Sequence, residues 1–142
     1  MLNENILRHQ IVEEARTYLG TKHIHQARLK GVGVDCAGML IGVAKTLNAI
    51  PPNYVFDNYS EQNDGSDLRN ELLKFCYEIS LDEILPGDIV TMSVYGNPQH
   101  CGFITDVGLI HALDYVVETN ISDKWRDRFV AAYRINGVRE CS

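Results

Sequence analysis

Three residues of this chain could together carry out thiol chemistry: Cys36, His100 and His111. Cys36 lies where a glycine-rich loop meets an apolar run with helical spacing, so we expect it at the start of a helix. The unpaired N–H groups and partial positive charge of a helix N-terminus favour the thiolate, which is the nucleophilic form of cysteine. Hydrolysis by a thiol also needs a base and a third group that orients the base. The sequence therefore predicts a nucleophile at Cys36 if an imidazole reaches it, and a small buried residue if none does.

The two histidines belong to consecutive β-rich runs. Neighbouring strands can place His100 and His111 side by side on one face of a sheet, where they would supply the base and its orienting group. The same alternation points Cys101 to the other face, so we expect that cysteine to lie away from the site. Buried cysteines and strand histidines are common in proteins, so each residue alone has a structural explanation. Only the ordered combination indicates chemistry.

The elements that must position these residues change from helices to strands along the chain. Helical spacing predicts helices over Leu7–Leu19, over Cys36–Leu47 with Asp35 as N-cap, and over Leu68–Ile79. Five β-rich runs follow, at Ile89–Val94, Gly102–Val107, Leu109–Leu113, Tyr115–Thr119 and Val130–Ile135. Residues Ser122–Arg128 fit one or two helical turns, and we expect Trp125 within them to close the core. Helices followed by an antiparallel sheet make an α+β fold.

Length and composition restrict the class of protein. The 142 residues fit a single domain over 1–142, with 45% hydrophobic and 23% charged residues. The net charge of −6 and the lack of a basic block disfavour nucleic-acid binding. No apolar run is long enough to cross a membrane, and the N-terminus lacks the pattern of a signal peptide, so we expect synthesis in the cytoplasm. The four cysteines form no CxxC pair, which favours reduced thiols.

A metal site is the main alternative for the polar residues. His23 and His25 could bind zinc together with Cys36 or His111, because imidazole and thiolate are suitable ligands. No paired cysteines or HExxH-type spacing support such a site. We therefore expect neither a metal nor an organic cofactor.

The combination of motifs resembles a known family. The matching segments are Tyr18–Thr21, His25–Arg28, Asp35–Gly38, His100–Gly102, His111–Ala112, Val116–Glu118, Trp125–Arg126 and Tyr133–Arg134. In this order they resemble the NlpC-type cell-wall peptidases, which are papain-like cysteine enzymes that cleave peptidoglycan stem peptides. The resemblance spans almost the whole chain and is greatest to the short phage and prophage branch encoded among tail genes.

The resemblance implies a papain-like fold in which the helix that carries the nucleophile packs on a central antiparallel sheet. It implies that Cys36 attacks the amide carbon after γ-D-glutamate in a stem peptide. His100 would be the general base and then the acid, and His111 would orient His100. The implied partners are peptidoglycan stem peptides and phage tail proteins, and the implied location is the virion tail or the cell wall.

Residues near the nucleophile depart from the family pattern. The loop tyrosine that often donates to the oxyanion is replaced by either His23 or His25. Asp35 could hold the free amine of the stem peptide or act only as a helix cap, and Ala37 replaces the usual serine. Because the charge of Asp35 opposes thiolate formation, we expect a His100 imidazolium to activate Cys36 more than the helix end does.

Three alternatives share these residues. An acyltransferase would pass the same thiol intermediate to an amine instead of water. A toxin would use the same chemistry against rival bacteria. A tail assembly protein would keep the fold without cleaving anything, although such a protein has no need for all three of Cys36, His100 and His111.

Overall fold

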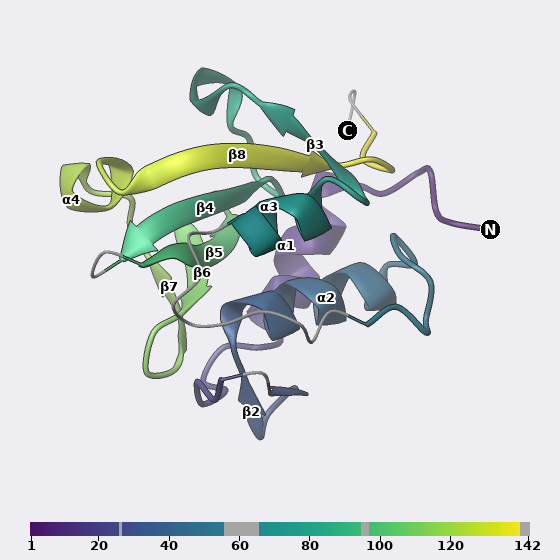
Figure 1. Ribbon diagram of the computed structural model, residues 1–142, viewed down its shortest axis with the longest axis horizontal. Coiled ribbons are helices and arrows are strands. Elements are labelled where there is room, and N and C mark those ends of the chain that lie inside the picture. Colours follow the sequence, from purple (N-terminus) through teal and green to yellow (C-terminus); the bar gives the residue numbers. More distant parts are fainter. Residues whose placement is uncertain (26, 56–65, 95–96, 140–142) are drawn as a thin grey trace.

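The computed structural model describes residues 1–142 apart from 26, 56–65, 95–96 and 140–142, so Gln26 and Cys141 lie outside the described residues. The helices are α1 (Arg8–Arg16), α2 (Cys36–Thr46), α3 (Ser66–Leu72) and α4 (Asp123–Arg126), with a 3-10 turn η1 (Leu81–Glu83). The strands are β1 (Arg28–Leu29), β2 (Gly33–Val34), β3 (Cys76–Ile79), β4 (Ile89–Val94), β5 (Asn97–Ile104), β6 (Leu109–Ala112), β7 (Val116–Thr119) and β8 (Phe129–Ile135). Figure 1 shows their arrangement.

The two N-terminal helices form where the apolar spacing predicts them. In α1, Ile11 and Ala15 lie on the buried face, and the chain leaves the helical path at Gly20, whose φ of 87° suits a residue without Cβ. In α2, Asp35 is the N-cap, as expected from the sequence. Most of α2 is buried, because it is apolar on nearly all sides.

Six strands form one antiparallel sheet in the order β3-β8-β4-β5-β6-β7. The predicted strands are confirmed, although β5 begins at Asn97, earlier than expected. In the pairing of β5 with β6, Gly102 stands opposite His111. The predicted α+β class with a central antiparallel sheet is therefore confirmed.

The expected helix over Leu68–Ile79 is wrong in its second half. The helix α3 ends at Leu72, and Cys76–Ile79 forms the edge strand β3, where Cys76 is opposite Ile135 of β8. The apolar spacing of this segment also fits a strand, and Tyr77 and Ile79 favour one. Pairing with β8 therefore decides the conformation, and the buried Cys76 belongs to a strand.

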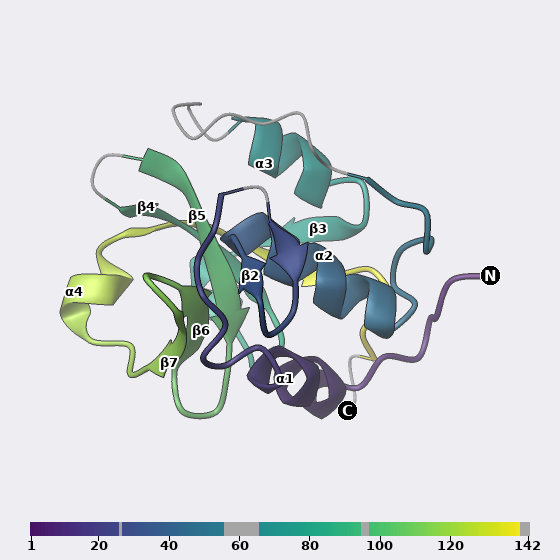
Figure 2. The same ribbon diagram turned by 90° about the horizontal axis from the view of Figure 1, so that it is seen from below.

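The two faces of the sheet pack against different helices. Figures 1 and 2 show α1 and α2 on one side of the sheet and α4 at the opposite side. The larger apolar cluster lies under α1 and α2 and includes Cys101 and Phe103 of β5. The smaller cluster includes Ile104 of β5 and is covered by Trp125 and Phe129. Alternation along β5 therefore directs neighbouring residues toward different layers.

A buried ion cluster joins the first and last elements. Asp88 is fully buried and accepts hydrogen bonds from Arg8 Nη1 at 3.0 Å and from Arg134 Nε and Nη2 at 2.9 and 2.8 Å. It also accepts the backbone N–H of Leu85. Both guanidinium groups thus find their counter-charge inside the protein. In the part of the chain that the structure describes, no helix has the length and apolar character to cross a membrane.

Candidate active site

Cys36 is the first residue of α2 and is partly buried. The preceding Asp35 is almost fully buried, and its Oδ1 accepts the backbone N–H of Gly38 at 2.7 Å. A side chain at Gly38 could not fit, because its Cβ would lie 2.3 Å from the carbonyl oxygen of Ala27. The order Asp-Cys-Ala-Gly therefore places a cap, a thiol and a close backbone approach within one helical turn. The prediction that Cys36 starts a helix is confirmed.

The two predicted histidines form a direct pair. His100 on β5 and His111 on β6 lie on adjacent strands, with His100 Nε2 at 3.0 Å from His111 Nδ1. Gly102 opposite His111 makes this approach possible, because a Cβ there would lie 2.9 Å from His111 Cβ and 2.5 Å from the carbonyl oxygen of Ile110. The expectation that neighbouring strands bring these imidazoles together is confirmed.

Further residues hold His111 in place. Its Nε2 lies 3.1 Å from the hydroxyl of Thr119 on β7, and Trp125 of α4 packs edge-to-face on its ring at a centroid distance of 4.6 Å. Trp125 packs against the smaller apolar cluster, as predicted, and so connects this cluster to the site. The sequence analysis missed Thr119. The available signal was its position on the strand after His111, diagonal to that residue in the pairing of β6 with β7.

Burial keeps both imidazoles neutral. Burial, followed by the charges of His111 and His23, lowers the pKa of His100 to about 3, and burial lowers the pKa of His111 to about 4. The expectation that a resting His100 imidazolium activates Cys36 is therefore wrong, because the enclosed site disfavours the charged ring. A neutral His100 can instead act as a base.

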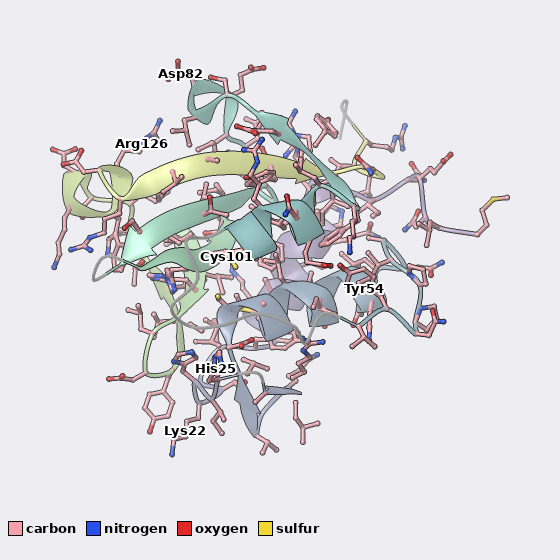
Figure 3. The ribbon with its side chains drawn as sticks, in the orientation of Figure 1. Lys22, His25, Tyr54, Asp82, Cys101 and Arg126 are labelled. Atoms are coloured by element: carbon pink, nitrogen blue, oxygen red, sulfur yellow. The ribbon has the colours of Figure 1, made fainter. Side chains whose placement is uncertain are left out.

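Cys101 lies beside the candidate nucleophile, which contradicts the expectation that it points away from the site. It does face the larger cluster, as alternation predicts, but α2 packs on that same face. The thiol of Cys101 is hydrogen-bonded to the thiol of Cys36, and this bond and burial raise the pKa of Cys101. Figure 3 shows Cys101 between the sheet and α2. This contact places the start of α2 against β5, the strand that also carries His100.

The structure separates the two loop histidines by position. His23 lies close enough to His100 for its positive charge to lower the pKa of His100, and its backbone N–H donates to the carbonyl of Asp114. His25 lies beside the nucleophile helix instead, with its Nδ1 3.9 Å from Asp35 Oδ2. Figure 3 shows His25 in the segment next to the start of α2. His23 therefore lies near the imidazole pair, and His25 lies near the start of α2.

A metal site would require at least three of these side chains to converge on one point. Across residues 1–139, leaving out the undescribed positions, no three His, Cys, Asp or Glu side chains are grouped so that they could hold a metal ion. His23, His25, Cys36 and His111 thus do not form the zinc site considered as an alternative.

No family model matches the chain, and no curated protein matches its sequence. Among solved structures, it is similar to an NLP/P60 family protein from Staphylococcus aureus, with 20% identity, a TM-score of 0.63, and coverage of 90% of this chain and 41% of that chain. An NlpC/P60 family protein from Bacillus cereus gives 18% identity, a TM-score of 0.65, and coverage of 90% and 40%. The NlpC/p60 domain of the peptidoglycan hydrolase SagA gives 20%, 0.62, and coverage of 92% and 100%.

The chain thus spans less than half of the Staphylococcus and Bacillus proteins and the whole of the SagA domain. At these identities the likeness concerns the fold. The predicted papain-like arrangement, with helix α2 packed on a central antiparallel sheet, is confirmed.

Proposed function

We propose that this chain is a cysteine peptidase that hydrolyses amide bonds in the stem peptides of bacterial peptidoglycan. The observation that carries the proposal is the buried imidazole pair of the central sheet, together with a cysteine at the start of the helix packed on that sheet. Cys36 starts α2, which packs on β5, and His100 of β5 is held by His111 at 3.0 Å. The fold shared with NlpC/P60 structures, one of them from a peptidoglycan hydrolase, supports the choice of substrate.

The hydrogen bonds of His111 determine which nitrogen of His100 would act as the base. In one tautomer, His111 donates from Nε2–H to Thr119 Oγ1 and accepts at Nδ1 from His100 Nε2–H. This arrangement leaves Nδ1 of His100 without a proton, so that His100 can take the proton of Cys36 as the thiol attacks the amide carbon. His100 then returns the proton to the leaving amine, and water completes the hydrolysis through the same base. His111 stabilises the charged His100 by accepting its Nε2–H.

The oxyanion formed in this attack needs donors that are already in place. We assign one donor to the backbone N–H of Cys36 at the start of α2 and a second to His23. The choice of His23 over His25 is supported by the closeness of His23 to His100. Its exposed ring can reach a substrate that binds above the imidazole pair.

Asp35 and His25 are proposed to recognise the substrate. Asp35 uses Oδ1 for the helix cap, while its Oδ2 faces His25 at 3.9 Å. A free amine at the end of a stem peptide would bind the Asp35 carboxylate on this side. With the amine held there, we propose that the stem peptide is cut after γ-D-glutamate, as the family resemblance implies. The sequence motifs support a phage tail-associated or prophage-encoded enzyme, and detection of the protein in purified virions would test this assignment.

Digestion of Gram-negative muropeptides with a mass-spectrometric readout tests the proposed activity. We expect the wild-type protein to release fragments cut after γ-D-glutamate, with water added at the new end. The Cys36→Ala variant should release none while its thermal unfolding midpoint stays near that of the wild type. Cleavage by Cys36→Ala would refute the peptidase assignment. A product that carries an added amine instead of water would identify an acyltransferase.

A further inference from the structure

Two cysteines with different access to solvent meet at the candidate site. Cys36 is partly exposed at the start of α2, whereas Cys101 on β5 is fully buried. Cys101 belongs to the larger apolar cluster, Cys36 packs against that same cluster where α2 lies on β5, and the two thiols are in hydrogen-bonding contact. The proposed mechanism uses only Cys36, so the adjacent Cys101 has no part in hydrolysis. The third described cysteine, Cys76, is buried on β3, which is separated from β5 by the two strands β8 and β4.

The difference in access gives the two thiols different reactivity. A small oxidant from solvent can reach Cys36, which must be open to substrate, but cannot reach Cys101 in the core. Burial and the contact with Cys36 raise the pKa of Cys101, which keeps this residue in the thiol form. An accessible sulfur with a protected partner beside it is the arrangement that turns a first oxidation into a disulfide.

We propose that Cys36 and Cys101 form a reversible disulfide when the protein meets a hydroperoxide, and that this bond switches the site off. The sulfur of Cys36 attacks one peroxide oxygen, giving a sulfenic acid on Cys36 and one water from hydrogen peroxide. The sulfur of Cys101 then attacks the sulfur of Cys36, the S–O bond breaks, and the hydroxyl leaves with the Cys101 proton as a second water. The two sulfurs lose two electrons in total, and the peroxide gains them.

To form this disulfide, the sulfur atoms of Cys36 and Cys101 must move closer together. A disulfide is about 2.0 Å long, which is shorter than a thiol hydrogen bond, so the Cys36 side chain must rotate toward β5. Once formed, the bond removes the candidate nucleophile and protects it from irreversible oxidation to sulfinic acid. A dithiol reductant restores both thiols.

Peroxide treatment of the wild-type, Cys101→Ala and Cys76→Ala proteins tests the inference. In the wild type we expect the intact mass to fall by about 2 Da and a tryptic peptide pair to be linked through Cys36 and Cys101. The treated protein should lose its cleavage activity, and dithiothreitol should restore that activity. Cys76→Ala should behave in the same way. Cys101→Ala should be active before treatment, but should lose activity irreversibly as Cys36 gains two oxygen atoms. Cys101→Val, which fills the same space with a β-branched side chain, serves in its place if Cys101→Ala does not fold.

A wild-type protein that gains two oxygens on Cys36 without a linked peptide would overturn the inference. The linked peptide is detected by mass and does not depend on peptidase activity. A linked peptide in a protein that cleaves no muropeptide would therefore support the disulfide and count against the proposed function.

Discussion

The protonation state of His100 determines which step this residue can perform, because a neutral imidazole can accept a proton and an imidazolium cannot. Burial lowers the pKa of His100 to about 3, so the resting ring is neutral, and in the proposed mechanism it becomes charged only while the thiol attacks. His111 lies at 3.0 Å from it and is itself bound to Thr119. In the proposed mechanism, this chain of hydrogen bonds therefore fixes which nitrogen of His100 acts as the base.

This dependence predicts unequal effects of histidine substitutions on activity. His111→Ala removes the partner that fixes the His100 tautomer, and we expect a loss of kcat of at least about 100-fold. His25→Ala removes a residue beside Asp35 that does not touch the imidazole pair, and we expect a clearly smaller loss. Muropeptide kinetics on the two variants provide the comparison. A larger loss in His25→Ala would overturn the assignment of His111.

The same burial predicts a pH dependence of stability. In the folded protein the pKa values of His100 and His111 are about 3 and about 4, below the value of 6.5 for an ordinary histidine. The unfolded chain therefore binds more protons as the pH falls below 6.5, and the free energy of unfolding decreases. Between pH 7 and pH 5 this decrease is about 2 kcal/mol for each histidine.

Urea unfolding at a series of pH values measures this effect. His100→Gln should lose about 2 kcal/mol less than the wild type over the same interval, because it lacks one of the titrating groups. His9→Gln is the matched control, since His9 is an exposed histidine of α1 outside the buried imidazole pair. Identical slopes for His100→Gln and the wild type would contradict the burial argument.

At the scale of elements, the start of α2 combines structure with chemistry. Asp35 caps the helix through Gly38 and stands next to Cys36, so one carboxylate stabilises the element that presents the thiol. Its second oxygen faces the loop histidine His25. The cap therefore uses one oxygen of this side chain, and the proposed binding of a substrate amine would use the other.

Two substitutions of Asp35 separate these roles. Asp35→Ala loses the cap, and we expect the free energy of unfolding to fall by about 1 kcal/mol. Asp35→Asn keeps an oxygen acceptor, so its stability should stay near that of the wild type. If the carboxylate binds the substrate amine, KM of Asp35→Asn should rise by about 10-fold or more. An unchanged KM would restrict Asp35 to its role as a helix cap.

At the scale of the whole molecule, the Asp88 cluster holds the helical and sheet parts together. Arg8 of α1 and Arg134 of β8 both bind Asp88, which precedes β4. Asp88 is fully buried, and the two guanidinium groups are nearly so. This cluster helps hold α1 and α2 on the face of the sheet where Cys36 meets Cys101.

We expect Asp88→Asn to lower the free energy of unfolding by about 3–5 kcal/mol, because it leaves two buried guanidinium groups without their counter-charge. Lys74→Ala is the control, since Lys74 pairs with Glu71 at the surface and such pairs contribute at most about 1 kcal/mol. Urea unfolding at pH 7 measures both. A similar small loss in both variants would show that the cluster is dispensable for stability.

Local patterns in the sequence were enough to predict most of the elements and the order of the candidate residues along the chain. Apolar spacing and the Asp35 cap placed Cys36 at the start of α2, and alternation placed His100 and His111 on neighbouring strands. These features depend on residues close together in the chain or on adjacent strands, so short-range patterns suffice to predict them.

Three features of the structure depend on long-range contacts and differ from the sequence predictions. Pairing with β8 converted Cys76–Ile79 from the expected helix into β3, because the apolar spacing fitted both conformations. The packing of α2 on β5 brought Cys101 to Cys36, and burial of the pair His100–His111 removed the expected imidazolium. These outcomes depend on which surfaces meet and how much water they exclude, and no local pattern in the sequence carries that information.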